Sequence, residues 1–105
     1  MKKMDTQEKI KAQLEENDII LYMKGSAMFP QCGFSGKAVE ILKACEAKFD
    51  TVDVLSNPDI RDGIKQYSSW PTIPQLYIKG EFIGGSDIML EMYQKGDLQE
   101  KIKAL

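Results

Sequence analysis

The sequence of 105 residues contains no histidine, and this absence removes several kinds of chemistry at once. Without an imidazole the chain has no Ser-His or Cys-His pair for nucleophilic catalysis, and no histidine to ligate a metal. It has only two cysteines, Cys32 and Cys45. Because no export signal accompanies them, we expect a reducing compartment and free thiols rather than structural disulfides.

Long apolar runs and an excess of positive charge are also missing. No stretch approaches the roughly 20 apolar residues that a membrane-spanning helix needs. With 14 Lys and Arg residues against 16 Asp and Glu residues, the net charge is −2, and no basic stripe for nucleic acid is expected. Residues 1–10 lack the apolar segment of a secretory signal. We therefore expect a cytoplasmic protein, a single domain over residues 1–105, with no membrane or nucleic-acid partner.

The most informative stretch covers residues 24–37 and places Cys32 between a strand and a helix. A continuous apolar run predicts a buried strand over 19–23, and the pattern after Cys32 predicts a helix over about 33–45. The first amides of a helix have no partner within it, and the helix dipole adds positive potential there. A thiol at this place is expected to lose its proton more easily than a free thiol, and Lys24 on the preceding loop adds a positive charge.

Serine occupies position 35, where a Cys-x-x-Cys redox motif carries its second cysteine. Because Ser35 forms no disulfide, a two-thiol cycle within this motif is excluded. Cys32 remains able to attack a disulfide, to form a mixed disulfide with a small thiol, or to bind a soft metal as thiolate. The residues alone leave these three alternatives open.

The helix after Cys32 carries an apolar stripe that predicts which face packs on the core. Its members share the spacing of one helix face and are Phe34, Ala38, Ile41, Leu42 and Cys45. A rise of about 1.5 Å per residue separates Cys45 from Cys32 by roughly 20 Å along the axis. That is too far for a disulfide, so we interpret Cys45 as a small core residue rather than a chemical partner.

The rest of the chain predicts further helices and strands. The expected elements are helices over about 5–16, 33–45, 57–69, 87–95 and 97–105, and strands over 19–23, 49–54, 75–78 and 81–84. Asp5, Asn57, and Ser86 or Asp87 are expected as helix caps. A helix between two strands implies a parallel pair, so the order α-β-α-β-α-β-β-α-α predicts an α/β, thioredoxin-like layout.

Two surface features each have two interpretations. Met28 and Phe29 lie in the loop before Cys32, where they either fold back on the domain or form an exposed apolar rim for a partner. Arg61 and Lys65 are four residues apart and share a helix face. They are either solvated surface cations or a paired anchor for a carboxylate.

Two turns rich in proline and glycine complete the set of candidate features. Trp70-Pro-Thr-Ile-Pro74 is a rigid connector, and Pro74 is a candidate cis proline because cis bonds are almost confined to X-Pro. Gly84-Gly-Ser-Asp87 opens a helix, and its glycines allow the backbone to approach a ligand closely with free amides pointing outward. By itself this turn is weak evidence of a site, because most such turns only cap a helix.

Four features together resemble one family. Lys24-Gly25, Cys32-Gly-Phe-Ser35, Trp70-Pro-Thr-Ile-Pro74 and Gly84-Gly-Ser-Asp87 occur in an order and spacing similar to the monothiol glutaredoxins of the Cys-Gly-Phe-Ser class. The resemblance extends from the first helix to about Gly96. It implies a thioredoxin-like glutaredoxin fold with a four-stranded mixed sheet and about five helices. The short length resembles the bacterial single-domain members.

The resemblance also implies roles for particular residues. Cys32 is expected to bind one iron of a 2Fe-2S cluster, with glutathione in a groove beside it. The residues expected to contact glutathione are Lys24, Arg61, Lys65, Thr72, Ile73, Pro74, Ser86 and Asp87. Several relatives carry cysteine where this chain has Ser86; a contact through the backbone amide survives that change, but a second redox thiol does not.

A count of ligands leads to the same expectation. A 2Fe-2S cluster needs four ligands, and one chain offers only Cys32 at this place. The Cys32 thiolates of two chains and the thiolates of two glutathione molecules complete the four ligands. This count predicts a homodimer bridged by the cluster and a monomer without it. Family resemblance implies a BolA-like partner and apo iron-sulfur recipients. The alternative is a glutathione-dependent thiol-disulfide oxidoreductase that uses Cys32. The long loop over 26–31 weighs against this enzyme, because the resemblance links a longer loop to poor turnover.

Overall fold

The computed structural model describes residues 4–105, so part of the N-terminal segment in which no secretory signal was found, residues 1–3, lies outside the described chain. Its helices are α1 (Thr6–Glu16), α2 (Gly33–Ala44), α3 (Pro58–Ser68), α4 (Ser86–Lys95) and α5 (Asp97–Lys103). Its strands are β1 (Ile19–Met23), β2 (Asp50–Asp53), β3 (Gln75–Ile78) and β4 (Glu81–Gly84). The predicted order of elements is confirmed, and no described helix is long and apolar enough to span a membrane.

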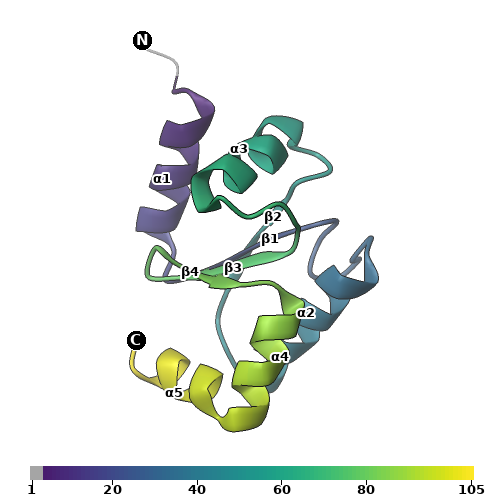
Figure 1. Cartoon of the computed structure of the whole chain (residues 1–105), viewed down its shortest axis with the longest axis vertical. Helices are drawn as coiled ribbons and strands as arrows, with labels where there is room; N and C mark the ends of the chain where they lie inside the picture. Colours follow the sequence, from purple (N-terminus) through teal and green to yellow (C-terminus); the bar gives the residue numbers. More distant parts are fainter. Residues whose placement is uncertain (1–3) are drawn as a thin grey trace.

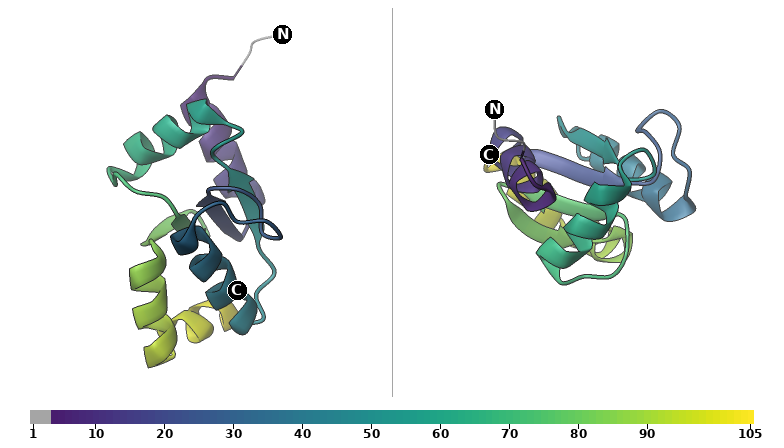
Figure 2. Two further views of the ribbon diagram at one scale, coloured as in Figure 1. Left: turned by 90° about the vertical axis from the view of Figure 1, so that its right-hand side faces the viewer. Right: turned by 90° about the horizontal axis from the view of Figure 1, so that it is seen from above.

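The four strands form one mixed sheet in the order β2-β1-β3-β4. Strand β1 pairs parallel with β2, with Ile20 opposite Asp50, as the intervening helix requires. It pairs antiparallel with β3, which pairs antiparallel with β4 through the hairpin at residues 79–80. Helices α1 and α3 cover one face of the sheet, and α2, α4 and α5 cover the other (Figures 1 and 2). The result is the expected thioredoxin-like, three-layer α/β fold.

Strand β1 lies in the interior of the sheet, and its side chains contribute to a hydrophobic core on each of the two faces. Ile19, Leu21 and Met23 belong to the core under α2, α4 and α5. Ile20 and Tyr22 belong to the core under α1 and α3. All five side chains are buried, which explains why the strand is apolar throughout instead of alternating.

The starts of the helices agree only in part with the expected caps. Asp5 caps α1 as predicted, because its Oδ1 accepts from the Glu8 amide at 2.8 Å. Asn57 occupies the N-cap of α3 as predicted, but its side chain makes no capping hydrogen bond; its amide group instead donates to the Asp53 carbonyl at 2.9 Å and closes the turn before α3. The cap of α4 is Gly85 rather than Ser86 or Asp87. A Cβ at position 85 would lie 3.2 Å from the Pro74 carbonyl oxygen, a contact that a larger residue makes only if the Pro74 backbone shifts.

Three side chains differ from the predicted apolar faces. Phe34 is 63% exposed, because it lies on the first turn of α2, next to a pocket rather than over the core. Tyr67 and Leu105, which residue spacing predicts on the apolar faces of α3 and α5, are also exposed, and Leu105 lies beyond the end of α5. Cys45 is half-buried at the end of α2 and packs against the core as predicted, and neither cysteine forms a disulfide.

Candidate functional site

Cys32 occupies the N-cap of α2, with an extended backbone at φ −154° and ψ 137°. The Ser35 backbone amide points at the sulfur and is the main cause of a lowered pKa for the Cys32 thiol. Partial burial opposes this shift, while the Phe34 amide and the Lys24 ammonium reinforce it. The direction of the pKa shift therefore agrees with the one expected from a thiol at the start of a helix.

Ser35 does more than replace a second cysteine. Its side chain is fully buried, and its Oγ accepts the Lys24 amide at 3.0 Å. The same side chain makes a further, smaller contribution to the lowered pKa of the Cys32 thiol. One serine thus links the end of β1 to the reactive sulfur, a role that the Cys-x-x-Ser pattern alone does not reveal.

The loop between β1 and Cys32 is closed by its own hydrogen bonds. The Gln31 amide donates to the Lys24 carbonyl at 2.9 Å, and the Ser26 amide donates to the Phe29 carbonyl at 3.3 Å. Gly25 has φ +88°, and a Cβ there would lie 2.7 Å from the Gln31 nitrogen, so this position requires glycine.

The tip of this loop settles one of the open alternatives. Met28 is 79% exposed and Phe29 is 69% exposed, so these side chains do not fold back on the domain. Together with Phe34 they place large apolar surface on both sides of Cys32 in the sequence. The loop before Cys32 therefore presents an exposed apolar rim, the second of the two interpretations.

Asp53 holds this loop against the neighbouring connection. Its Oδ1 accepts the Gly25 amide and the Leu55 amide, each at 2.9 Å, and its Oδ2 accepts the Ser56 hydroxyl at 2.9 Å. The Gly25 amide is the main cause of a lowered pKa for this carboxyl. Our sequence analysis missed Asp53. Its signal was an acidic residue at the carboxyl end of a strand parallel to β1, where loops from both strands meet.

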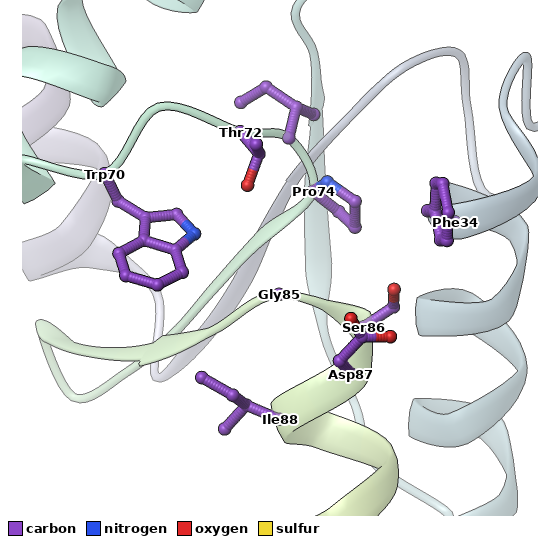
Figure 3. Close-up of a pocket in the computed structure, with 9 residues that line it drawn as sticks. Phe34, Trp70, Thr72, Pro74, Gly85, Ser86, Asp87 and Ile88 are labelled. Atoms are coloured by element: carbon purple, nitrogen blue, oxygen red, sulfur yellow. The ribbon is translucent and has the colours of Figure 1, made fainter.

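A pocket of about 260 Å³ lies beside the start of α2 and joins three segments that are distant in sequence. They are Phe34, the 70–74 connector, and residues 85–88 at the start of α4. In Figure 3, Phe34 and Trp70 lie on opposite sides, with Pro74 and the start of α4 between them. The Ile73–Pro74 peptide bond is cis, as predicted for this proline.

The structure brings together only part of the predicted set of site residues. Five of them line the pocket: Thr72, Ile73, Pro74, Ser86 and Asp87. Cys32 lies two residues before Phe34 and borders an adjoining shallow hollow with Lys37 and Glu40. Within residues 4–105, the lining of the main pocket does not include Lys24, Arg61 or Lys65. Phe34, Trp70 and Ile88 also line the pocket, although no ligand contact was predicted for them. Phe34 and Trp70 lie within the motifs singled out in the sequence, and all three are exposed apolar side chains.

The three predicted cations are not among the four lysines that form ion pairs in the described chain. Lys9, Lys79, Lys95 and Lys101 each pair with a carboxylate on the surface. In the described chain, no such ion pair involves Lys24, Arg61 or Lys65. The Nε of Arg61 is buried, and residues 4–105 supply it with no acceptor. These cations therefore remain available to an anionic ligand.

Metal-ligating groups are sparse in the described chain. Residues 4–105 contain no cluster of three or more His, Cys, Asp or Glu side chains that could hold a metal ion. The site offers one thiolate, Cys32, as a strong ligand for a soft metal. Any cluster bound there needs ligands from outside this chain.

Comparison with known proteins is consistent with this geometry. The family model described as Glutaredoxin matches residues 19–83. A protein of Haemophilus ducreyi named Glutaredoxin 4 is 55% identical over 100 residues, which cover 95% of this chain and 94% of that protein. A Synechocystis protein named as a monothiol glutaredoxin is 50% identical over 99 residues, covering 94% of this chain and 92% of its own. Among solved structures, reduced apo GrxS14 of poplar superposes with a TM-score of 0.80 at 49% identity, over 91% of this chain and 88% of its own.

Proposed function

The chain belongs to the glutaredoxin family and is of the monothiol type, and from this premise we propose that it binds glutathione and carries a 2Fe-2S cluster on Cys32. The observation that carries the proposal is the donor set of the site. Cys32 is a thiol of lowered pKa at the start of α2, and Ser35 stands where a resolving thiol would be. A single thiolate of this kind suits a shared metal cluster better than a two-thiol redox cycle.

Glutathione carries a carboxylate at each end, an ammonium at one of them and a thiol in the middle, and the site has a complementary arrangement. The first amides of α4, at Ser86 and Asp87, suit the γ-glutamyl carboxylate, while the Asp87 carboxylate suits the neighbouring ammonium. The backbone of Ile73 suits pairing with the peptide, in the manner of an added strand. Arg61, with Lys65 on the same helix, supplies cations for the glycine carboxylate. Lys24 acts near Cys32 and suits the glutathione thiol.

The ligand count then predicts an assembly. A 2Fe-2S cluster needs four ligands, usually thiolates. Cys32 from each of two chains and one glutathione thiolate at each site complete the four, so the loaded form is a homodimer and the empty form a monomer. Because mobile glutathione supplies half of the ligands, the assembly is labile. This suits a cytoplasmic carrier that passes the cluster to apo iron-sulfur proteins, with a BolA-like protein as partner.

A second candidate function is supported by the lowered pKa of Cys32. The Cys32 thiolate attacks the glutathione sulfur of a mixed disulfide, so that a bond from Cys32 to glutathione forms and the substrate leaves as thiolate. A second glutathione thiolate then releases Cys32, and glutathione disulfide leaves. We favour the carrier because the loop over 26–31 is long, and resemblance to the family links such a loop to poor turnover.

Anaerobic reconstitution separates the two functions. The protein is incubated with iron and sulfide, with or without glutathione, and visible absorbance is followed on a size-exclusion column. The carrier predicts a coloured dimer that forms only with glutathione and reverts to a colourless monomer when glutathione is removed. Brisk turnover of a glutathione mixed disulfide, with no coloured dimer under any condition, would establish the oxidoreductase instead.

A further inference from the structure

The carboxamide of Gln75 is a buried polar group behind the pocket. Gln75 is the first residue of β3, follows Pro74 directly and is 0% exposed. Its Nε2 donates to the Trp70 carbonyl and to the Thr72 carbonyl, each at 3.1 Å. Its Oε1 accepts the Tyr77 hydroxyl at 3.1 Å. Both donors and the acceptor of this amide are therefore used.

These bonds fix a segment that has few other means of attachment. The connector from Trp70 to Pro74 contains two prolines, which have no amide hydrogen to donate. Gln75 holds two of its carbonyls on the side of the buried tyrosines. Among residues 4–105, no loop or side-chain hydrogen bond involves the backbone of Ile73. Ile73 lines the pocket, so its backbone groups are open to a ligand there.

We propose that Gln75 is a positioning residue for the ligand of this pocket: its amide holds the carbonyls of Trp70 and Thr72 so that the Ile73 backbone is presented to a bound peptide. The proposal rests on the proposed function for the identity of the ligand, which is glutathione. Gln75 itself is buried and touches no ligand. Its contribution is to order the connector before the ligand arrives.

The expected effect follows from the cost of ordering the connector during binding. Without the two Nε2 donors, the carbonyls of Trp70 and Thr72 lose their partners and the segment samples other conformations. Glutathione must then order the segment as it binds, and the dissociation constant rises about tenfold. The thiol of Cys32 shares no hydrogen bond with Gln75, so the pKa of Cys32 stays unchanged.

A purely structural role predicts a different pattern. If Gln75 only satisfies buried polar groups, its loss lowers the free energy of unfolding and leaves the affinity of the folded protein unaltered. Gln75→Met removes the amide at similar size, and Gln75→Asn keeps the amide but shortens its reach. Tyr77→Phe removes the hydroxyl and leaves both Nε2 bonds in place. Gln94→Met makes the same chemical change on the exposed surface of α4.

The test measures two quantities on each folded variant. Nitrogen-15 relaxation order parameters of the ligand-free protein report how rigidly the Thr72 and Ile73 amides are held. Titration with glutathione gives the dissociation constant, followed through Trp70, which is the only tryptophan in the sequence and lines the pocket. We expect Gln75→Met and Gln75→Asn to lower the order parameters of Thr72 and Ile73 and to weaken binding about tenfold, with Tyr77→Phe and Gln94→Met within about twofold of wild type.

The outcomes separate this inference from the proposed function. Unchanged order parameters and unchanged affinity in both Gln75 variants overturn the positioning role, as does an equal loss in Gln94→Met. If neither Gln75 variant folds, Gln75 is needed for the fold itself and the inference is wrong. If wild type does not bind glutathione but the order parameters of Thr72 and Ile73 still fall in the Gln75 variants, the proposed ligand fails while the ordering of the connector stands.

Discussion

The Oγ of Ser35 accepts the backbone amide of Lys24 at 3.0 Å, so a buried hydroxyl joins the end of β1 to the first turn of α2. The same side chain contributes to the lowered pKa of the Cys32 thiol. Serine at this position therefore replaces a resolving thiol with a group that stabilises both the loop and the thiolate. This relationship is the basis of the first prediction.

Ser35→Ala is expected to raise the pKa of Cys32 and to lower the free energy of unfolding by about 1 kcal/mol, because the Lys24 amide loses its acceptor. The pKa is measured from thiolate absorbance in the ultraviolet as pH is varied. Ser26→Ala is the matched control, since the Ser26 hydroxyl bonds the Phe29 amide within the loop and not the sulfur. An unchanged Cys32 pKa in Ser35→Ala would show that the hydroxyl does not act on the thiolate.

The two cysteines are expected to differ in reactivity and in cluster binding. The pKa of Cys32 is lowered, whereas burial raises the pKa of Cys45. At neutral pH, iodoacetamide should therefore label Cys32 well before Cys45, as mass spectrometry of peptides would show. Cys32→Ser should abolish cluster binding while the far-ultraviolet circular dichroism remains that of wild type. Cys45→Ser should keep the cluster at some loss of stability, and retention of the cluster by Cys32→Ser would refute the ligand assignment.

Arg61→Ala is expected to weaken glutathione binding about tenfold, because a charge-assisted hydrogen bond to the glycine carboxylate is lost. Isothermal titration calorimetry gives the dissociation constant. Lys11→Ala, which removes an exposed cation from α1, is the control and should bind as wild type does. A dissociation constant unaffected by Arg61→Ala would mean that this cation is only solvated.

The Asp53 carboxylate predicts a pH dependence of stability. Its pKa is lower in the folded protein, so its contribution is fully present above the ordinary pKa of about 3.9 and is lost as pH falls through the lowered value. The stability difference between wild type and Asp53→Asn should therefore be constant above about pH 5 and should shrink below about pH 4. Urea unfolding at several pH values measures it, with Asp50→Asn on the same strand as control. A difference that persists undiminished at pH 2 would contradict the assignment.

The sequence predicted a helix or strand correctly where the local residue pattern matches the place of that element in the fold. The run Ile19–Met23 is apolar throughout because both faces of β1 are covered, and Asp5 caps α1 through its own side chain. Phe34 shows where periodicity fails: it shares the spacing of the α2 core stripe, yet it lies next to the pocket instead of over the core. Spacing along a helix does not reveal where the sheet beneath it ends.

The sequence predicted those parts of the pocket that have a local signal in the residues. The connector 70–74 and the turn into α4 were recognised because proline and glycine restrict or free the backbone in ways visible in the sequence. Asp53 and Gln75 were missed because their roles depend on hydrogen bonds to backbone groups brought near only by the fold. Polar side chains at strand ends carry no local signal that distinguishes such contacts from solvent exposure.

Native mass spectrometry of the reconstituted protein tests the central claim most directly, because it counts every ligand of the cluster. The account predicts a dimer whose mass equals two chains, one 2Fe-2S cluster and two glutathione molecules, and which is lost in Cys32→Ser. A loaded species that contains no glutathione, or that survives the loss of Cys32, would contradict the account.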